Sequence, residues 1–198
     1  MTHLERMVID ISYRQNLSHI GSCLTILPIL EEIYRMKNPD EKCIISCGHA
    51  HLAHAVIMQH YGIIESAEEN VKEHGIHCER AGGCDVSTGS LGQGLAISLG
   101  IAMADRTKKC YCVISDGEAM EGMIYEALNA KEKYKVDNLI VYCNFNGYCA
   151  YDETNIEVLK RLPGLIIVDT SQHWFIKEFL QEAHYRALNE TDYEKIIR

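Results

Sequence analysis

The sequence Ser115-Asp116-Gly117-Glu118 follows one short apolar run, residues 110–114, and Asn144-Phe145-Asn146-Gly147-Tyr148 follows another, residues 139–143. Runs this short and rich in Val, Ile and Tyr are typical of strands that are buried on both faces of a parallel sheet. Between them, residues 121–134 carry apolar side chains at helical spacing. We therefore expect a strand–helix–strand unit with polar residues at the carboxyl ends of both strands, where open α/β sheets bind ligands.

The polar residues at these two strand ends have complementary chemistry. Asp116 offers a charged oxygen, Asn146 offers a neutral amide oxygen, and a backbone carbonyl after Gly147 can add a third ligand. Mg²⁺ prefers such oxygen ligands and commonly shares its coordination shell with phosphate oxygens. Two ordinary turns would explain each pair of residues alone. Their position at matching strand ends favours a magnesium site.

The rest of the chain alternates helical and strand patterns around this unit. Apolar spacing predicts helices over residues 4–15, from 22 or 24 to 36, and over 91–104 and 174–188, with strands over 42–46 and 165–169. Residues 47–54 lead into a further helix that ends at 61, and residues 65–74 form a polar helical segment. Residues 151–162 are interpreted as a connection with a short helix, and residues from about 189 as a polar tail. We expect one domain over residues 1–198, a doubly wound α/β fold whose mostly parallel sheet is flanked by helices.

Composition limits the possible partners. The chain has 198 residues, of which 47% are hydrophobic and 24% are charged, as in ordinary globular proteins. A net charge of −9 without a basic cluster argues against nucleic acid as a partner, and no apolar run approaches the length that spans a membrane. The first residues lack the apolar core of a signal peptide. Because the nine cysteines fall in apolar runs or beside motifs, we expect reduced thiols and a cytoplasmic location.

Four motifs, covering about residues 10–175, resemble those of the transketolase family in the same order. Asp116-Gly117, with Asn146 further along, resembles the thiamine diphosphate signature, with Ser115 in the place of its first glycine. The segment Ser87-Thr88-Gly89-Ser90-Leu91-Gly92-Gln93-Gly94 is similar to the family's Thr-Gly-(Pro/Ser)-Leu-Gly-Gln-Gly. Asp116-Gly117-Glu118-Ala119-Met120-Glu121-Gly122 is similar to Asp-Gly-x-x-x-Glu-Gly, and Ser18-His19-Ile20-Gly21 is similar to Gly-His-x-Gly.

The resemblance implies a set of site residues. It implies that His19, His49 and His77 are catalytic, binding substrate hydroxyls or moving protons. The implied Mg²⁺ ligands are Asp116, Asn146 and the Tyr148 carbonyl, and the implied cofactor-binding residues are His49, Gly89, Leu91, Gly117, Glu121 and Asn146. His77 stands in a loop that resembles the family's His-Pro-Glu, with Cys78 in place of the proline. For the family's later histidine near the substrate we expect no counterpart.

The implied function is that of one half of an enzyme. The chain resembles the cofactor-binding amino-terminal part of a split transketolase, which transfers a two-carbon ketol unit between sugars or sugar phosphates through thiamine diphosphate and Mg²⁺. The family also needs a pyrimidine-binding domain, with a glutamate that activates the cofactor, and no motif here matches it. The resemblance therefore implies an α2β2 assembly with a carboxyl-terminal transketolase-like partner subunit. It also implies that Glu121 meets the activating glutamate of a neighbouring subunit.

Other functions fit parts of the sequence. A decarboxylase or a deoxyxylulose-phosphate-type synthase would use the same cofactor, and a scaffold subunit would keep the fold without catalysis. Cys47, His49, His51 and His54 suggest the zinc site of a hydrolase, for which three or four ligands must converge; alternatively, His51 and His54 are ordinary helix residues that face different ways. The glycine loop, residues 89–94, is compatible with an anion site at a helix amino terminus or with tight packing of a helix on a sheet.

Overall fold

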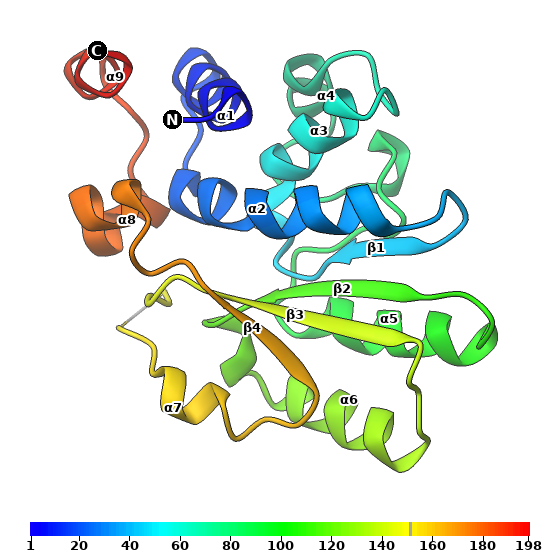
Figure 1. Ribbon diagram of the computed structural model, residues 1–198. Helices are drawn as coiled ribbons and strands as arrows, with labels where there is room; N and C mark the ends of the chain where they lie inside the picture. Colours follow the sequence, from blue (N-terminus) through cyan, green and yellow to red (C-terminus); the bar gives the residue numbers. More distant parts are fainter. Residues whose placement is uncertain (151) are drawn as a thin grey trace.

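Four parallel strands form the centre of the molecule. The computed structural model describes residues 1–150 and 152–198. Its sheet has the order β1 (Lys42–Ile45), β2 (Cys110–Ser115), β3 (Leu139–Phe145), β4 (Leu165–Asp169), and each neighbouring pair is parallel (Figure 1). The predicted α/β fold with a parallel sheet is confirmed.

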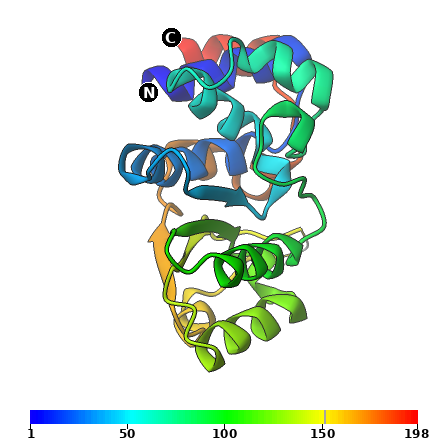
Figure 2. The same cartoon turned by 90° about the vertical axis from the view of Figure 1, so that its right-hand side faces the viewer.

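Helices cover both faces of this sheet (Figures 1 and 2). One side holds α1 (His3–Gln15), α2 (Ile20–Met36), α3 (His51–His60), α4 (Ala67–His74), α8 (Trp174–Phe179) and α9 (Glu190–Ile197). The other side holds α5 (Gln93–Ala104), α6 (Gly122–Lys133) and α7 (Ile156–Leu159). Short 3-10 helices add η1 (Gly48–Ala50), η2 (Arg80–Gly82), η3 (Glu118–Met120) and η4 (Leu180–His184).

The strand residues alternate between two apolar cores. In β2, Tyr111 and Val113 pack in the core that contains α2 and α3, whereas Cys112 and Ile114 pack in the core that contains α5 and α6. A strand buried on both faces has no polar face, which is why its sequence is apolar throughout. The register pairs Ser115 with Asn144, so that β2 and β3 end at the same edge of the sheet.

Some helix boundaries differ from the sequence prediction. Helix α5 begins at Gln93 rather than at 91, because Gly92 has a φ of 84° and cannot continue a right-handed helix. Helix α2 begins at Ile20 and contains Pro28 within it. Tyr151, the first residue of the predicted connection, lies outside the described residues, while the short helix expected there is α7.

The carboxyl-terminal region differs most. The predicted helix over 174–188 is broken, because Leu180 has a φ of 50° and turns the chain from α8 into η4. The expected polar tail is helix α9, which begins with a capping box formed by Asn189 and Asp192. This helix lies beside α1 (Figure 2). The rings of Tyr13 and Tyr193 stack between the two helices, with centroids 4.1 Å apart.

Two further expectations concern the chain as a whole. The nine cysteines are free thiols, as predicted. Within residues 1–150 and 152–198, none of the helices has both the length and the apolar character needed to cross a bilayer.

Candidate active site

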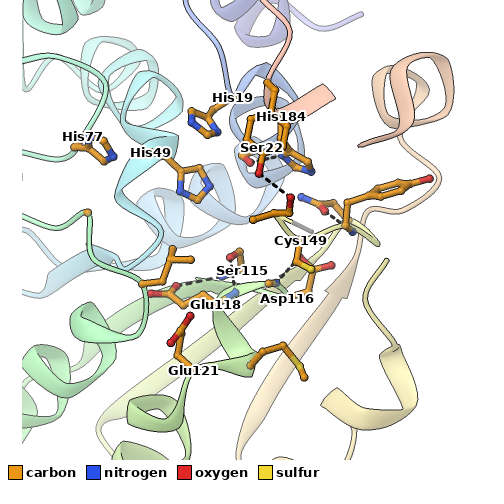
Figure 3. A pocket seen from close by; sticks show the side chains of 18 residues that line it. His19, Ser22, His49, His77, Ser115, Asp116, Glu118, Glu121, Cys149 and His184 are labelled. Carbon is orange, nitrogen blue, oxygen red and sulfur yellow. Dashed lines mark hydrogen bonds between the residues drawn. The ribbon is translucent and has the colours of Figure 1, made fainter. Parts of the chain in front are cut away.

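A cavity of about 320 Å³ opens at the carboxyl edge of the sheet. Its size is at the lower end of the range for small-molecule sites. The residues predicted from the sequence as catalytic, cofactor-binding or metal-binding all line it: His19, His49, His77, Gly89, Leu91, Asp116, Gly117, Glu121, Asn146 and Tyr148. Figure 3 shows histidines on one wall and the acidic residues that follow β2 on the opposite wall. The structure therefore brings together residues from segments that are far apart in the sequence.

Asp116 links the ends of β2 and β3. Its Oδ2 accepts a hydrogen bond from the Gly147 N–H at 2.8 Å and another from the Thr154 hydroxyl at 2.5 Å, while Oδ1 accepts from the Gly117 N–H at 3.1 Å. Asn146 is also buried, and its Oδ1 accepts from the Tyr148 N–H at 3.1 Å. Burial raises the pKa of Asp116 to about 6, against the lowering effect of these hydrogen bonds. A buried carboxylate of this kind is stabilised by a nearby cation.

Glu118 was given no role by the sequence reasoning, and it joins three parts of the site. It is fully buried, and its Oε1 accepts hydrogen bonds from the Ser46 hydroxyl at 2.5 Å and from the Gly92 N–H at 2.6 Å. Its own N–H donates to the Ser115 hydroxyl at 3.1 Å. Burial raises the pKa of Glu118 to about 7. Glu118 therefore positions the glycine loop relative to the ends of β1 and β2.

The glycine loop, residues 89–94, both lines the cavity and packs α5 tightly on the sheet. Gly89 and Leu91 line the cavity. Gly94 instead packs against the end of β1, because a Cβ at Gly94 would lie 2.6 Å from the Ser46 Cα. That distance leaves no room for a side chain, so tight packing of α5 on the sheet explains this glycine.

His19 and His49 lie together in the cavity, with ring centroids 4.8 Å apart (Figure 3). Burial lowers the pKa of both, that of His49 to about 3, so the rings are neutral near pH 7. His19 has a φ of 61°, a left-handed conformation that is uncommon for residues other than glycine and that clusters at functional sites. Neutral imidazoles can both donate and accept a hydrogen bond.

His184 is a cavity residue that sequence reasoning missed. We expected no later histidine near the site, but the break at Leu180 returns the chain so that η4 lies against α2 and His184 lines the cavity. Its Nδ1 is 2.9 Å from the Ser22 hydroxyl, and its backbone carbonyl accepts a hydrogen bond from the His19 N–H at 2.8 Å (Figure 3). Burial, with a smaller effect of His19, lowers the pKa of His184 to about 4.

The suggested hydrolase site of Cys47, His49, His51 and His54 is not formed. His49 lies in η1 and lines the cavity, whereas His51 and His54 are buried in α3 and point elsewhere. Cys47 is buried with its Sγ near the Val113 carbonyl. The 3-10 turn at Gly48–Ala50 separates these side chains, so their proximity in sequence did not predict proximity in space.

Curated proteins with similar sequences are transketolases and transketolase subunits. One subunit of the apulose-4-phosphate transketolase of Phocaeicola vulgatus is 30% identical in an alignment of 161 residues that covers 71% of this chain and 57% of that protein. The 6-deoxy-6-sulfo-D-fructose transketolase subunit SqwG of a Clostridium species is 29% identical over 164 residues, 72% of this chain and 60% of that protein. The transketolase-like protein 2 of Mus musculus is 30% identical over 151 residues, 65% of this chain and 24% of that protein.

A domain family described as 1-deoxy-D-xylulose-5-phosphate synthase matches residues 2–187, nearly the whole chain. The chain belongs to the family of transketolases and 1-deoxy-D-xylulose-5-phosphate synthases. The resemblance found in the four motifs is thereby confirmed. The chain spans less than two thirds of the length of these curated relatives, about 57% of the Phocaeicola protein and 24% of the mouse protein.

Transketolase-family membership implies thiamine diphosphate as the cofactor, and the cavity has features that fit such a group. Asp116 and Asn146 provide the hard oxygen donors that suit a divalent cation bound to a diphosphate. At Gly117, a Cβ would lie 2.9 Å from the Cys149 Cβ, so a side chain at this position would collide with the loop that follows β3. The Nε2 atom of His184 is buried beside the cavity and has no hydrogen-bond partner among the described residues. The cavity thus offers both oxygen ligands for a cation and an unused polar group.

Proposed function

We propose that this chain is the cofactor-binding subunit of a split transketolase-like enzyme, which transfers a two-carbon ketol unit between sugars or sugar phosphates. The observation that carries the proposal is the convergence of Asp116 and Asn146 with three predicted catalytic histidines in one cavity. Two of the relatives are named as transketolase subunits, and their lengths are closer to that of this chain than those of the full-length transketolases are.

Each part of the cavity has a proposed role. Asp116, Asn146 and the Tyr148 carbonyl would hold Mg²⁺, and with it the diphosphate of the cofactor. Gly117 and His49 would contact the bound cofactor near its diphosphate, while Gly89 and Leu91 would contact its aminopyrimidine side. Glu121 lines the cavity and is exposed, as expected for a residue that meets a neighbouring subunit.

The cavity histidines would bind the substrate and transfer protons. When bound, thiamine diphosphate supplies a carbon centre that adds to a ketose carbonyl and stabilises the carbanion left by C–C cleavage. His19, His49 and His77 would bind substrate hydroxyls and move protons between carbonyl and alkoxide oxygens. Their placement on the wall opposite Asp116 supports this division of roles (Figure 3).

The site would be completed by a partner. We propose that a carboxyl-terminal transketolase-like subunit provides the pyrimidine-binding half and the activating glutamate, in an α2β2 assembly located in the cytoplasm. The composition of α5 supports a partner that covers its outer face, because this helix is apolar on all sides. Gly100 and Met103 are exposed on that face, and Ile97 and Ile101 are only half-buried. Helices of this composition are normally buried. The nine free thiols support the reducing compartment.

A direct test is reconstitution. The chain is co-purified with the product of the neighbouring open reading frame, and thiamine diphosphate and Mg²⁺ are added. A panel of ketose and ketose-phosphate donors with aldose acceptors is then analysed by mass spectrometry. We expect products lengthened by two carbons only when both chains are present. Decarboxylation of a 2-oxo acid with no ketol transfer would contradict the proposal.

That second outcome corresponds to the alternative function. The matching domain family is described as 1-deoxy-D-xylulose-5-phosphate synthase, an enzyme that decarboxylates a 2-oxo acid and joins it to an aldehyde. The names of the relatives favour ketol transfer. Incubating the complex with pyruvate and an aldose phosphate separates the two, because only the synthase reaction releases carbon dioxide.

A further inference from the structure

A second cluster of histidine and cysteine side chains lies outside the cavity. His51 and His54 occupy the first turn of α3, where residues three apart share one face of a helix. Cys78 and Cys84 stand on either side of η2. All four side chains are buried, with exposed fractions of 0%, 2%, 1% and 5% in the order His51, His54, Cys78, Cys84.

Three of these four side chains bring their ligand atoms together. Those of His54, Cys78 and Cys84 all lie within 4.8 Å of one another. The His54 Nδ1 is 3.5 Å from the Cys84 Sγ. Zinc bonds of about 2.1 Å to nitrogen and about 2.3 Å to sulfur, at a tetrahedral angle, place such a pair about 3.6 Å apart. The observed spacing, which is that of a hydrogen bond between the thiol and the imidazole, also matches the spacing of two ligands of one zinc ion.

His51 is positioned as the fourth ligand. Its ring lies near both the Cys84 thiol and the Asn70 amide, and its buried Nε2 has no hydrogen-bond partner within the part of the chain that the structure describes. A buried, unpaired ring nitrogen costs free energy unless some other group satisfies it. A metal ion at the centre of the cluster would do so.

In His51 and His54, one ring nitrogen already has a hydrogen-bond partner. The His51 Nδ1 is 2.9 Å from the Gly75 carbonyl, and the His54 Nε2 is 2.6 Å from the Tyr34 hydroxyl. Histidines that bind metals almost always use the second ring nitrogen in this way, which fixes the ring and its tautomer. The nitrogens left over are His51 Nε2, which is buried and unpaired among the described residues, and His54 Nδ1, which lies 3.5 Å from the Cys84 Sγ.

We propose that His51, His54, Cys78 and Cys84 form a structural zinc site. Two thiolates and two imidazoles in a tetrahedral arrangement select zinc over Mg²⁺ or Ca²⁺, which prefer oxygen ligands. Four protein ligands leave no open position for water, and catalytic zinc sites keep one. The site therefore holds the fold and does not carry out hydrolysis.

The zinc would fix the loop that forms one side of the cavity. His77, labelled in Figure 3, directly precedes Cys78. The Cys78 carbonyl accepts a hydrogen bond from the Thr88 N–H at 3.0 Å, and the His77 ring lies against Gly89, where a Cβ would be 3.2 Å from its Cδ2. Binding Cys78 and Cys84 to α3 thus positions both His77 and Gly89. Because the site does not form in the unfolded chain, the free energy of metal binding also adds to the stability of the folded chain.

Metal analysis of the untagged full-length chain, co-purified with its partner where needed, tests the site. We expect about one zinc per chain to survive gel filtration. The variants Cys84→Ala and His54→Ala should lose it. Cys110→Ala is the matched control, because Cys110 is also a buried cysteine but lies in β2, packed in the core that contains α5 and α6, and this variant should keep the zinc.

Two measurements on the wild-type chain also test the site, and they do not depend on whether the variants fold. Cobalt substituted for zinc should give the intense visible bands of a tetrahedral site and a sulfur-to-cobalt charge-transfer band. Removal of the metal by a chelator should lower the thermal midpoint and speed cleavage by trypsin after Arg80, which is exposed in the loop between the cysteines.

Three results would overturn the proposal. They are a chain that takes up no zinc after growth and reconstitution with zinc salts, a disulfide between Cys78 and Cys84, or an unchanged zinc content in Cys84→Ala. None of these measurements depends on ketol transfer, so they test the zinc site independently of the proposed activity.

Discussion

The Asp116 carboxylate and the Gly147 N–H are joined by a hydrogen bond of 2.8 Å, which ties the loop after β2 to the loop after β3. The same carboxylate accepts from Thr154 and is fully buried. Burying a charged carboxylate this deeply between two strand ends costs free energy unless a group of opposite charge binds to it. The hydrogen bond holds the Asp116 carboxylate against the loop that contains Asn146, the second proposed cation ligand.

Replacing Asp116 should abolish binding of the cofactor with its metal. Because loss of a supporting residue around a metal costs about 10- to 100-fold in affinity, loss of the ligand itself in Asp116→Ala should cost at least about 100-fold. Calorimetric titration of the assembled complex with thiamine diphosphate and Mg²⁺ measures this. Thr154→Val, which removes only a supporting hydroxyl, should cost less. Equal affinity of Asp116→Ala and wild type would show that the assignment is wrong.

His49 should matter for turnover more than for folding. The side chain lines the cavity, and the structure shows no side-chain hydrogen bond that ties its ring to the core among the described residues. We expect His49→Ala to keep its circular dichroism spectrum and to bind cofactor, but to lose about 100-fold or more in kcat, the range of a general acid or base. Unfolding of this variant would favour a structural histidine instead.

The pocket histidines should make the chain sensitive to mild acid. Burial lowers the pKa of His184 to about 4, with His19 adding to the effect. An unfolded histidine takes up a proton below about pH 6.5, whereas folded His184 does not until about pH 4. The unfolded state therefore binds more protons in this window, and the free energy of unfolding falls as the pH is lowered from about 7 to about 5.

Urea denaturation at these two pH values should show the effect. The loss for the wild type should exceed that for His184→Asn by on the order of 1–2 kcal/mol. Asparagine keeps a polar atom near the Ser22 hydroxyl but cannot take up a proton. Equal losses in the two proteins would contradict the lowered pKa of His184.

Features that depend on local sequence signals were predictable, whereas features that depend on contacts between distant residues were not. Strands β2 and β3, and the position of Asp116 and Asn146 at their ends, were predictable because apolar runs and polar strand ends are local signals. Glu118 was missed because its function depends on Ser46 and Gly92, which are distant in sequence. The sequence grouped His54 with Cys47, whereas the cysteines that His54 meets in space, Cys78 and Cys84, lie on a distant loop.

The carboxyl-terminal region shows the limit of periodicity. Residues 174–188 have helical spacing, but the left-handed turn at Leu180 is set by packing and not by local propensity. That turn places His184 in the cavity, so a mistaken helix also concealed a site residue. The helix α9 had a signal that was not used, since Asn189 and Asp192 stand at the spacing of a capping box.

Two glycines of α5 should respond to alanine in opposite ways. Gly94→Ala should destabilise the chain by about 1–3 kcal/mol, because its Cβ would meet the Ser46 backbone at 2.6 Å. Gly100→Ala should stabilise it by about 0.5–1 kcal/mol, because nothing lies within 4 Å and alanine favours a helix. Thermal unfolding of the isolated chain measures both, since Gly100 is on the outer face of α5. Stabilisation by Gly94→Ala would contradict the close packing of α5 on β1.

The last prediction is that the isolated chain has no ketol transfer activity and acts only in a complex. The apolar outer face of α5 includes Gly100 and Met103, and α6 adds exposed Met123 and Tyr125. Obligate interfaces are large and apolar, on the order of 2,000 Å² or more, and the exposed apolar residues of these two helices would contribute to such an interface. We therefore expect the purified chain to self-associate without turnover, and to gain activity in proportion to the complex formed with its partner.

Charge placed on this surface should weaken assembly. Met103→Lys puts an ammonium group on the apolar outer face of α5, and it should reduce the assembled fraction in analytical ultracentrifugation. Glu132→Lys is the control, because Glu132 is a charged, exposed residue near the end of α6, and this variant should assemble as the wild type does. Full activity from a monomeric, isolated chain would overturn the split-enzyme proposal, because the cofactor would then be activated by residues of this chain alone.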